Sequence, residues 1–124
     1  MCGCFFCRAL ESGDFLIDNR LAAARYDDFP VSPGHILVVP KRHTPDWWNA
    51  TAEERDAMLK LLDEAKAIVD RELHPDGYNI GMNLGEAAGQ SVMHLHLHLI
   101  PRYTGDCPNP KGGVRGVIPE KQSY

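Results

Sequence analysis

Apolar and polar positions alternate most regularly at residues 94–100, where histidine and leucine follow one another. Side chains of a β-strand point alternately to its two faces, so this pattern predicts a strand with imidazoles on one face and leucines on the other. We expect the leucine face to pack in the core and the imidazole face to line a cleft. The residues concerned are His94, Leu95, His96, Leu97, His98 and Leu99.

Four further segments are predicted as strands because they are short apolar runs between turn residues. Residues 35–40 give the clearest prediction, since they form a β-branched run that ends at a proline. Residues 15–18, 21–26 and 78–83 are the other three, and the alanines of 21–26 make that segment the weakest strand former.

A long helix is predicted from Thr51 to about residue 73. Thr51 and Glu54 have the spacing of a capping box, in which each side chain accepts a hydrogen bond from the other residue's backbone N–H. Apolar residues then recur at helical spacing on one stripe, and the sequence Pro-Asp-Gly at 75–77 ends the helix. The stripe consists of Met58, Leu61, Leu62, Ala65, Ile68, Val69 and Leu73.

These elements together predict an α+β fold, since strands flank one capped helix and a glycine-containing turn at 85–89 precedes the histidine strand. We expect an antiparallel sheet of about five strands with the long helix packed on one face. The chain of 124 residues is long enough for a single domain with a buried core at residues 1–103. Residues 104–124 are rich in glycine and proline and predict a loop or an extended C-terminal arm.

The composition limits the kinds of partner that the protein is expected to bind. The net charge is −4, whereas a protein that binds long nucleic acids needs a basic surface, so no such partner is expected. A mononucleotide or dinucleotide remains compatible, because local donors can bind its phosphates. No apolar run approaches the roughly 20 residues of a membrane span. The first residues do not resemble a secretion signal, so a cytoplasmic location is expected.

Three imidazoles on one face bring polar nitrogens that need partners and add little to packing. Besides a purely structural role, two chemical interpretations remain: a metal site, or nucleophilic catalysis by one imidazole. The turn at 85–91 favours catalysis on a phosphate, because its backbone N–H groups and the side chains of Gln90 and Ser91 are donors for phosphate oxygens.

Residues 89–100, Gly-Gln-Ser-Val-Met followed by His-Leu-His-Leu-His-Leu-Ile, resemble the signature of the histidine-triad (HIT) nucleotide hydrolases and transferases. The surrounding sequence matches that family in order from about Cys4 to Arg102. The resemblance implies the HIT-like α+β fold, a small-molecule nucleotide substrate, and a homodimer in which the sheets continue across the interface.

The resemblance also implies roles for the triad. His96 is expected to attack the α-phosphorus of the substrate and form a nucleotidyl-imidazole that water then hydrolyses. His98 is expected to donate to a non-bridging phosphate oxygen, and His94 to orient the segment. Gln90 and Ser91 are expected to bond the bridging or leaving oxygen.

Other positions match the family's nucleotide contacts. Asp27 corresponds to a position whose side chain bonds the ribose hydroxyls; the alternative is a solvated turn carboxylate. Asn83 corresponds to an amide that contacts phosphate or supports the histidines. His35 is either near the site or a strand-end histidine. In the C-terminal arm, Lys111 and Arg115 could reach the leaving phosphate in the partner subunit's site.

Cys4 and Cys7 form a Cys-x-x-Cys pair, which in a cytosolic chain favours metal binding over a disulfide framework. Several microbial members of the family bind structural Zn²⁺ with such a pair, and the matching histidines here are His43 and His94. Two thiolates and two imidazoles form the closed tetrahedral set that structural zinc prefers. Cys2 is a competing thiol.

The predicted function is therefore that of a nucleotide phosphohydrolase. We expect cleavage at the α-phosphate of adenine dinucleotides or nucleoside phosphoramidates, as in proteins similar to diadenosine polyphosphate hydrolases. One alternative is a nucleotidyltransferase or phosphorylase of the same superfamily, with phosphate in place of water. The other is a non-enzymatic zinc- or nucleotide-binding module. The sequence leaves the acceptor and the base preference open.

Overall fold

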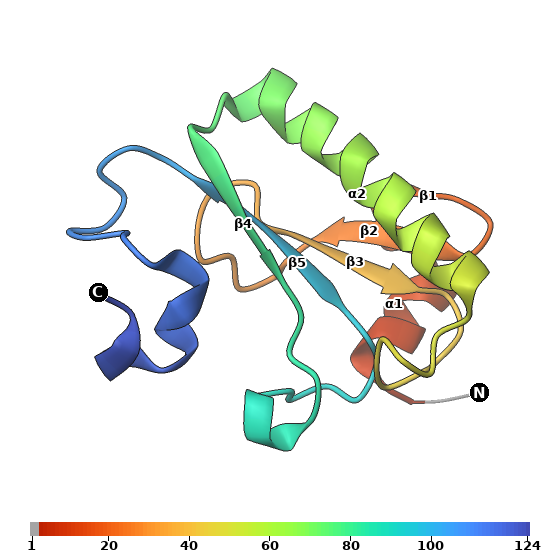
Figure 1. Ribbon diagram of the computed structural model, residues 1–124. Coiled ribbons are helices and arrows are strands. Elements are labelled where there is room, and N and C mark those ends of the chain that lie inside the picture. Colours follow the sequence, from red (N-terminus) through yellow and green to blue (C-terminus); the bar gives the residue numbers. More distant parts are fainter. Residues whose placement is uncertain (1–2) are drawn as a thin grey trace.

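A five-stranded antiparallel sheet forms the centre of the computed structural model, which describes residues 3–124. The strands pair in the order β1-β2-β3-β5-β4, so the last strand along the chain lies inside the sheet and β4 lies at its edge (Figure 1). Their bounds are β1 Ile17–Asp18, β2 Ala22–Tyr26, β3 Ile36–Pro40, β4 Gly77–Gly81 and β5 Leu97–Arg102. Cys2 lies outside the described residues.

The long helix α2 (Ala52–Leu73) packs across one face of the sheet (Figure 1). Its first turn carries the predicted capping box: the Thr51 hydroxyl accepts from the Glu54 N–H at 3.0 Å, and the Glu54 carboxylate accepts from the Thr51 N–H at 2.8 Å. The helix ends where His74 adopts a left-handed conformation. The predicted α+β architecture is thus confirmed.

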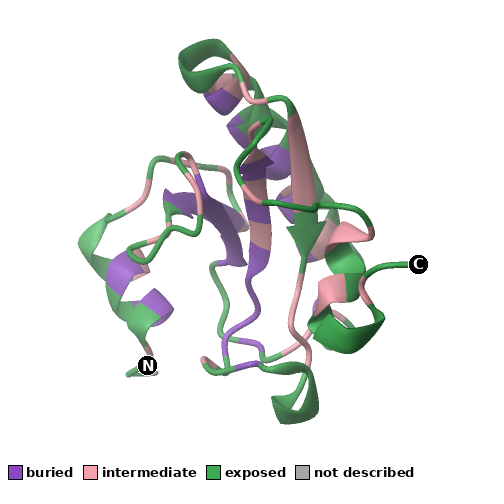
Figure 2. Ribbon diagram, turned by 90° about the vertical axis from the view of Figure 1, so that its left-hand side faces the viewer, coloured by how far each residue is buried: buried purple, intermediate pink, exposed green. Residues whose placement is uncertain are grey.

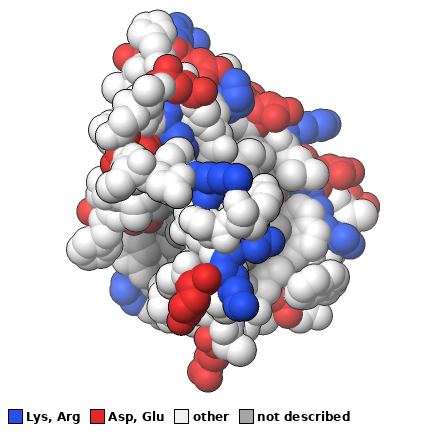
Figure 3. Space-filling model, turned by 60° about the vertical axis from the view of Figure 1, so that its left-hand side comes forward, with Lys and Arg blue, Asp and Glu red and all other residues white. Residues whose placement is uncertain are grey.

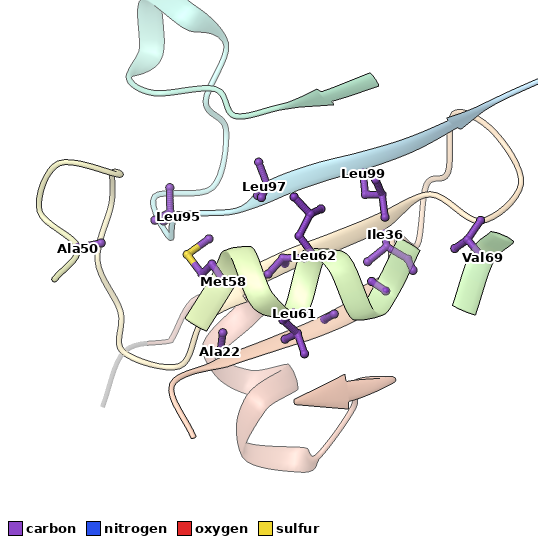
Figure 4. Packing of buried hydrophobic residues seen from close by; sticks show 13 residues of the cluster. Ala22, Ile36, Ala50, Met58, Leu61, Leu62, Val69, Leu95, Leu97 and Leu99 are labelled. Atoms are coloured by element: carbon purple, nitrogen blue, oxygen red, sulfur yellow. The ribbon is translucent and has the colours of Figure 1, made fainter. Parts of the chain in front are cut away.

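The core between α2 and the sheet contains all three leucines of the alternating segment, as predicted (Figure 4). Burial is concentrated in the central strands and on the inner side of the helices (Figure 2), and β3 is buried along its whole length. The strand residues of this core are Ala22, Ala24, Ile36, Val38, Leu97 and Leu99, and Leu95 joins them from the segment before β5. The helix contributes Met58, Leu61, Leu62, Ala65 and Val69.

The opposite face of the sheet is covered by helix α1 (Phe5–Ser12), which the sequence pattern did not predict. Its Phe6 packs against Ala23, Leu37 and Val39, the strand residues that point away from α2. A glycine, Gly13, ends the helix with a φ of 75°. This face also carries the triad histidines, so α1 lies beside the candidate site.

The prediction of a strand from residue 94 is wrong for its first three residues, because β5 begins at Leu97. Continuing the β3–β5 register places Pro40 opposite Leu95. Proline has no N–H to donate to a ladder. The Leu95 N–H instead donates to the Thr44 carbonyl at 2.7 Å. His94 and His96 therefore lie on irregular backbone that leads into the strand.

Smaller differences concern the strand ends and the C-terminal segment. β1 begins two residues later than predicted, at Ile17, and β4 ends at Gly81 rather than at residue 83. Residues 104–124 are not extended: they include the 3-10 helices η2 (Gly113–Val117) and η3 (Pro119–Lys121), and η2 lies next to β4 (Figure 1). A third 3-10 helix, η1 (Glu86–Ala88), precedes the triad.

The basic residues of the C-terminal segment contact their own segment. Arg115 donates to the Lys121 carbonyl at 2.7 Å, and both Arg115 and Lys111 lie over the ring of Tyr124. Within the described residues, no helix has both the length and the hydropathy to cross a lipid bilayer.

Candidate functional site

The triad histidines differ in burial along the segment. His94 is completely buried, His96 is 8% exposed, and His98 is half-buried at the start of β5. The rings of His96 and His98 are 5.2 Å apart between centroids, so these two imidazoles are in contact. The structure brings the three histidines together as the alternation predicted, although two of them precede the strand.

His96 is held in one tautomer. Its Nδ1 lies 2.8 Å from the backbone carbonyl oxygen of His94. A carbonyl only accepts hydrogen bonds, so Nδ1 carries the proton and Nε2 of the neutral ring has a lone pair. A neutral imidazole with a fixed lone pair at Nε2 is a nucleophile.

His98 is connected to a second histidine, His35, which the sequence left undecided. The Val31 N–H donates to His35 Nδ1 at 3.1 Å, so Nε2 of the neutral His35 ring carries the proton. His35 Nε2 is 2.9 Å from His98 Nδ1 and donates to it. His98 therefore holds its own proton on Nε2, the nitrogen that faces away from His35, where it can donate to a ligand.

Burial keeps this pair neutral. Desolvation lowers the pKa of His98 to about 4, with smaller contributions from His96 and His35. Desolvation also lowers the pKa of His35, against an opposing effect of the Asp27 carboxylate. At neutral pH, His98 is therefore a hydrogen-bond donor without a positive charge.

Asp27 lies beside these two histidines. One carboxylate oxygen is 3.5 Å from His35 Nε2, and the other accepts the Phe29 N–H at 2.9 Å. Asp27, His35 and His98 are close enough to form a metal-ligand set. However, a metal would need a lone pair on His35 Nε2, where the Val31 bond places a proton, so the geometry favours hydrogen bonding over metal binding here.

Gln90 is buried, and its amide is fully engaged. Its Oε1 accepts the Gly85 N–H at 2.8 Å, and its Nε2 donates to the carbonyls of Pro45 at 2.8 Å and Val92 at 3.1 Å. In this structure Gln90 therefore braces the loop before the triad, and its amide does not point donors at a phosphate. Ser91 follows it and is exposed.

A cavity of about 450 Å³ opens beside His98 and His35. Asn83 is half-buried in its wall, next to Met82, and the C-terminal segment closes one side with Val114 and Val117. The cavity thus has apolar walls and polar groups near the histidines, which is the usual composition of a small-molecule site.

Cys4, Cys7, His43 and His94 form a second cluster, on the other side of His94. The His94 Nε2 lies 2.8 Å from the Pro40 carbonyl and donates to it, so the lone pair of His94 is on Nδ1. That nitrogen is 3.4 Å from the Cys4 sulfur and 3.6 Å from the Cys7 sulfur. Burial lowers the pKa of His94, which keeps this lone pair free of a proton.

These distances fit zinc. Tetrahedral bonds of about 2.05 Å to nitrogen and about 2.3 Å to sulfur place ligand atoms about 3.3 to 3.8 Å apart. The Nδ1 atoms of His43 and His94 are 3.2 Å apart, and His43 Nδ1 is 3.6 and 3.5 Å from the two sulfurs. The Cys7 sulfur takes part in a disulfide in this structure, so binding through both sulfurs requires reducing conditions.

Sequence reasoning missed two features of the site. Phe6 lies between the two cysteines and contacts the rings of His94 and His96, with centroids 5.7 and 5.1 Å away. The signal for it was an apolar residue inside the Cys-x-x-Cys pair. The Pro40 carbonyl, which sets the His94 tautomer, gave no signal because it comes from a distant part of the sequence.

Comparisons of the sequence and of the structure with known proteins point to the same family. The family model of the HIT domain matches residues 10–105. An uncharacterised 16.1 kDa HIT-like protein of Mycoplasma pneumoniae is 37% identical over 103 residues, which are 81% of this chain and 72% of that protein. An AP-4-A phosphorylase of Mycobacterium tuberculosis is 34% identical over 97 residues, 77% of this chain but only 50% of the phosphorylase.

Among solved structures, a Zn-bound histidine triad family protein from Mycobacterium smegmatis superimposes with a TM-score of 0.73 at 37% sequence identity. The superposition covers 84% of this chain and 78% of that one. The sheet order and the helix across it are therefore a known fold.

Proposed function

The chain belongs to the HIT domain family, whose members bind and process nucleotides, and from this premise we propose that it is a nucleotide phosphohydrolase that works through a covalent nucleotidyl-His96 intermediate. The proposed substrates are adenine dinucleotides, such as diadenosine polyphosphates, and nucleoside phosphoramidates. The proposal rests chiefly on one observation: the His94 carbonyl holds the proton on His96 Nδ1 and leaves the Nε2 lone pair for attack.

In the first step, the lone pair of His96 Nε2 forms a bond to the α-phosphorus, and the bond from phosphorus to the leaving group breaks. The leaving group keeps the electron pair of that bond. The ring becomes cationic, and the hydrogen bond from Nδ1 to the His94 carbonyl stabilises that charge. In the second step, a water oxygen forms a bond to phosphorus and the P–N bond breaks, with its electron pair returning to His96 Nε2. One proton of the water passes to solvent, and neutral His96 and the nucleoside monophosphate are released.

Neighbouring groups supply binding and charge stabilisation. The His98 Nε2–H, fixed by the donation from His35, is proposed to bond a non-bridging phosphate oxygen. Asp27 is proposed to accept from the ribose hydroxyls, and Ser91 to bond the leaving oxygen. Asn83 lies in the cavity wall, where an amide can contact phosphate. Gln90 is assigned the different role of positioning this loop.

Phosphate in place of water is the second candidate acceptor. The similarity to an AP-4-A phosphorylase favours it, although this chain spans only about half of that protein. The two acceptors give different products from diadenosine tetraphosphate: water yields AMP, whereas inorganic phosphate yields ADP from the transferred half. Assays with and without phosphate therefore separate hydrolase from phosphorylase.

We also propose structural Zn²⁺ at Cys4, Cys7, His43 and His94. The donor geometry supports it, and a cytoplasmic location, where thiols stay reduced, suits it. The metal would hold α1 and the loop after β3 against the triad segment, and it supplies no reacting group.

We propose a homodimer as well, because β4 is an edge strand that can pair with a second copy. Figure 3 shows one face of the molecule, on which several basic side chains lie near the centre and acidic side chains lie around them. Because the net charge is −4, we propose small ligands rather than long nucleic acids.

The decisive test is the mass of the intact protein immediately after mixing with diadenosine tetraphosphate or an adenosine phosphoramidate. We expect wild type to gain one adenylyl group transiently and to release product, and His96→Gly to do neither while still binding nucleotide. Equal adduct on both proteins would place the chemistry elsewhere. If replacing any one of the three triad histidines lowered the metal content but not the turnover, the result would favour the non-enzymatic binding module.

A further inference from the structure

The hydrogen bond of His96 is not sufficient to hold its ring in one plane. The bond from Nδ1 to the His94 carbonyl fixes which nitrogen is protonated, but a ring held at one atom can still tilt about that bond. The direction of the Nε2 lone pair follows the ring plane. Attack in line on phosphorus depends on that direction, and a small misplacement of a reacting group can cost a large factor in rate.

Two rings contact His96 and limit this tilt. His98 lies 5.2 Å away at an interplanar angle of 65°, and Phe6 lies 5.1 Å away at 42°. His98 is half-buried and lines the cavity. Phe6 is 3% exposed and packs on Leu37 and Val39 of the sheet, so it is the fixed contact of the two.

Phe6 is placed by the turn that carries the cysteines. Cys4 is the N-cap of α1, and its sulfur accepts from the Cys7 N–H at 3.3 Å. Both sulfurs approach His94 Nδ1, at 3.4 and 3.6 Å. One helical turn therefore touches the metal-ligand cluster through Cys4 and Cys7 and touches the nucleophile through Phe6.

We propose that Phe6 is a positioning residue for His96, and that the Cys4–Cys7–His43–His94 cluster fixes α1 so that Phe6 sets the ring plane of the nucleophile. The proposal rests on the proposed function for its effect on rate, but its structural part does not. It predicts that the metal cluster and the reactive nitrogen are coupled through a side chain that binds neither metal nor substrate.

The test compares Phe6→Leu with Phe5→Leu in reduced, zinc-loaded protein. Phe5 is the neighbouring residue of the same turn, is 37% exposed and lies over Arg25, and no contact joins it to a triad ring among the described ring pairs. We expect Phe6→Leu to lower kcat on the order of tenfold with KM little changed, and Phe5→Leu to leave both unchanged.

A measurement without substrate tests the structural part. A ring that is free to tilt also breaks the Nδ1–H bond to the His94 carbonyl for part of the time, and it then loses its preference for one tautomer. The ¹⁵N shifts of the His96 ring distinguish the Nδ1–H from the Nε2–H tautomer and therefore report this loss of position. We expect a single Nδ1–H form in wild type and in Phe5→Leu, and a mixture with faster exchange of the Nδ1 proton in Phe6→Leu. Removing zinc from wild type with a chelator is expected to give the same mixture.

The kinetic and NMR measurements distinguish a failure of the proposed function from a failure of the proposal on Phe6. If no nucleotide forms an adduct, the proposed function fails while the ring measurement still decides the role of Phe6. A Phe6→Leu protein with a single tautomer and wild-type kcat would overturn the proposal. The proposal would also be overturned if the wild-type protein kept a single His96 tautomer after zinc was removed. Should circular dichroism show that Phe6→Leu is unfolded, Phe6→Met, whose unbranched and flexible side chain adapts better to the space left by the ring, carries the same prediction.

Discussion

The site depends on backbone groups that decide which nitrogen of each histidine carries a proton. The carbonyl of Pro40 sets His94, the carbonyl of His94 sets His96, and the Val31 N–H sets His35, which in turn sets His98. Each triad imidazole thus has one nitrogen held in a hydrogen bond within the protein. In the proposed function, the other nitrogen faces a metal in His94, a phosphorus atom in His96 and a phosphate oxygen in His98. The same residue type would then perform three tasks because its hydrogen-bond partners differ.

The depressed pKa values of His35 and His98 predict an effect of pH on stability. Between pH 6.5 and the folded pKa of His98, about 4, the unfolded chain binds protons that the folded chain does not, so stability falls as pH falls. Each proton contributes at most about 1.4 kcal/mol per pH unit, and His98 less because it is only half-buried. Urea unfolding at a series of pH values measures the slope.

The matched variant is His98→Asn, which removes one titrating group at the site. We expect it to reduce the loss of stability below pH 6.5 relative to wild type. Identical slopes in wild type and His98→Asn would contradict a depressed pKa at this residue.

At the scale of elements, the start of α2 fixes a loop that the site needs. Glu54 is buried and accepts from Arg42 through both carboxylate oxygens, at 2.9 and 2.8 Å, besides closing the capping box with Thr51. The Arg42 hydrogen bond is the main reason that the pKa of Glu54 falls to about 2. Arg42 is followed by His43 of the candidate metal-ligand cluster, so the helix cap and this candidate ligand lie on one anchored segment.

Substitutions at this cap should therefore affect both stability and metal binding. Thr51→Ala removes one cap acceptor and is expected to cost about 1 kcal/mol in the free energy of unfolding. Glu54→Ala also leaves Arg42 without its carboxylate and is expected to cost more, on the order of 2 to 3 kcal/mol, and to weaken zinc binding. Denaturant titration measures the first effect and a competing chelator the second.

Glu53→Ala provides the control, since Glu53 is an exposed neighbour in the same turn. It is expected to change the free energy of unfolding by no more than about 0.5 kcal/mol. A loss as large for Glu53→Ala as for Glu54→Ala would mean that the negative charge at the N-terminus of the helix, rather than the cap network, explains the result.

At the scale of the whole molecule, the metal-ligand cluster joins segments that are far apart in the chain. Its residues come from α1, from the loop after β3 and from the segment before β5, and helix α1 lies on the face of the sheet opposite α2. A metal there would act as a cross-link between these parts. The C-terminal segment, by contrast, closes the cavity from the side of β4.

Zinc is therefore expected to stabilise the folded chain as a ligand of the native state. In reducing buffer we expect the purified protein to contain one zinc per chain and to lose several degrees of Tm on chelation. Cys4→Ser and His43→Ala should lose the metal, and Cys107→Ser, outside the cluster, should retain it. Metal analysis together with thermal unfolding gives both numbers.

Equal zinc content in wild type and Cys4→Ser would exclude the proposed ligand set. A wild-type protein without zinc after purification in reductant, and with no rise in Tm on zinc addition, would exclude structural zinc altogether.

The sequence by itself determined the features that depend on local period and spacing. Alternation at residues 94–99 fixed which side chains face the α2 core, because strand-like backbone turns successive residues to opposite sides, and this held even before β5 begins. The Thr51–Glu54 spacing fixed the start of α2, because a capping box involves only one helical turn.

Only the tertiary structure decided the features whose partners come from distant segments. Pro40 ends the β3–β5 ladder, which gives residues 94–96 the irregular backbone that turns the His94 carbonyl onto His96. The contact of Phe6 with His96 and the hydrogen bond between His35 and His98 likewise join residues 63 to 90 positions apart. The physical reason is that a hydrogen bond or ring contact between segments depends on how the whole sheet packs, which no local pattern of residues specifies.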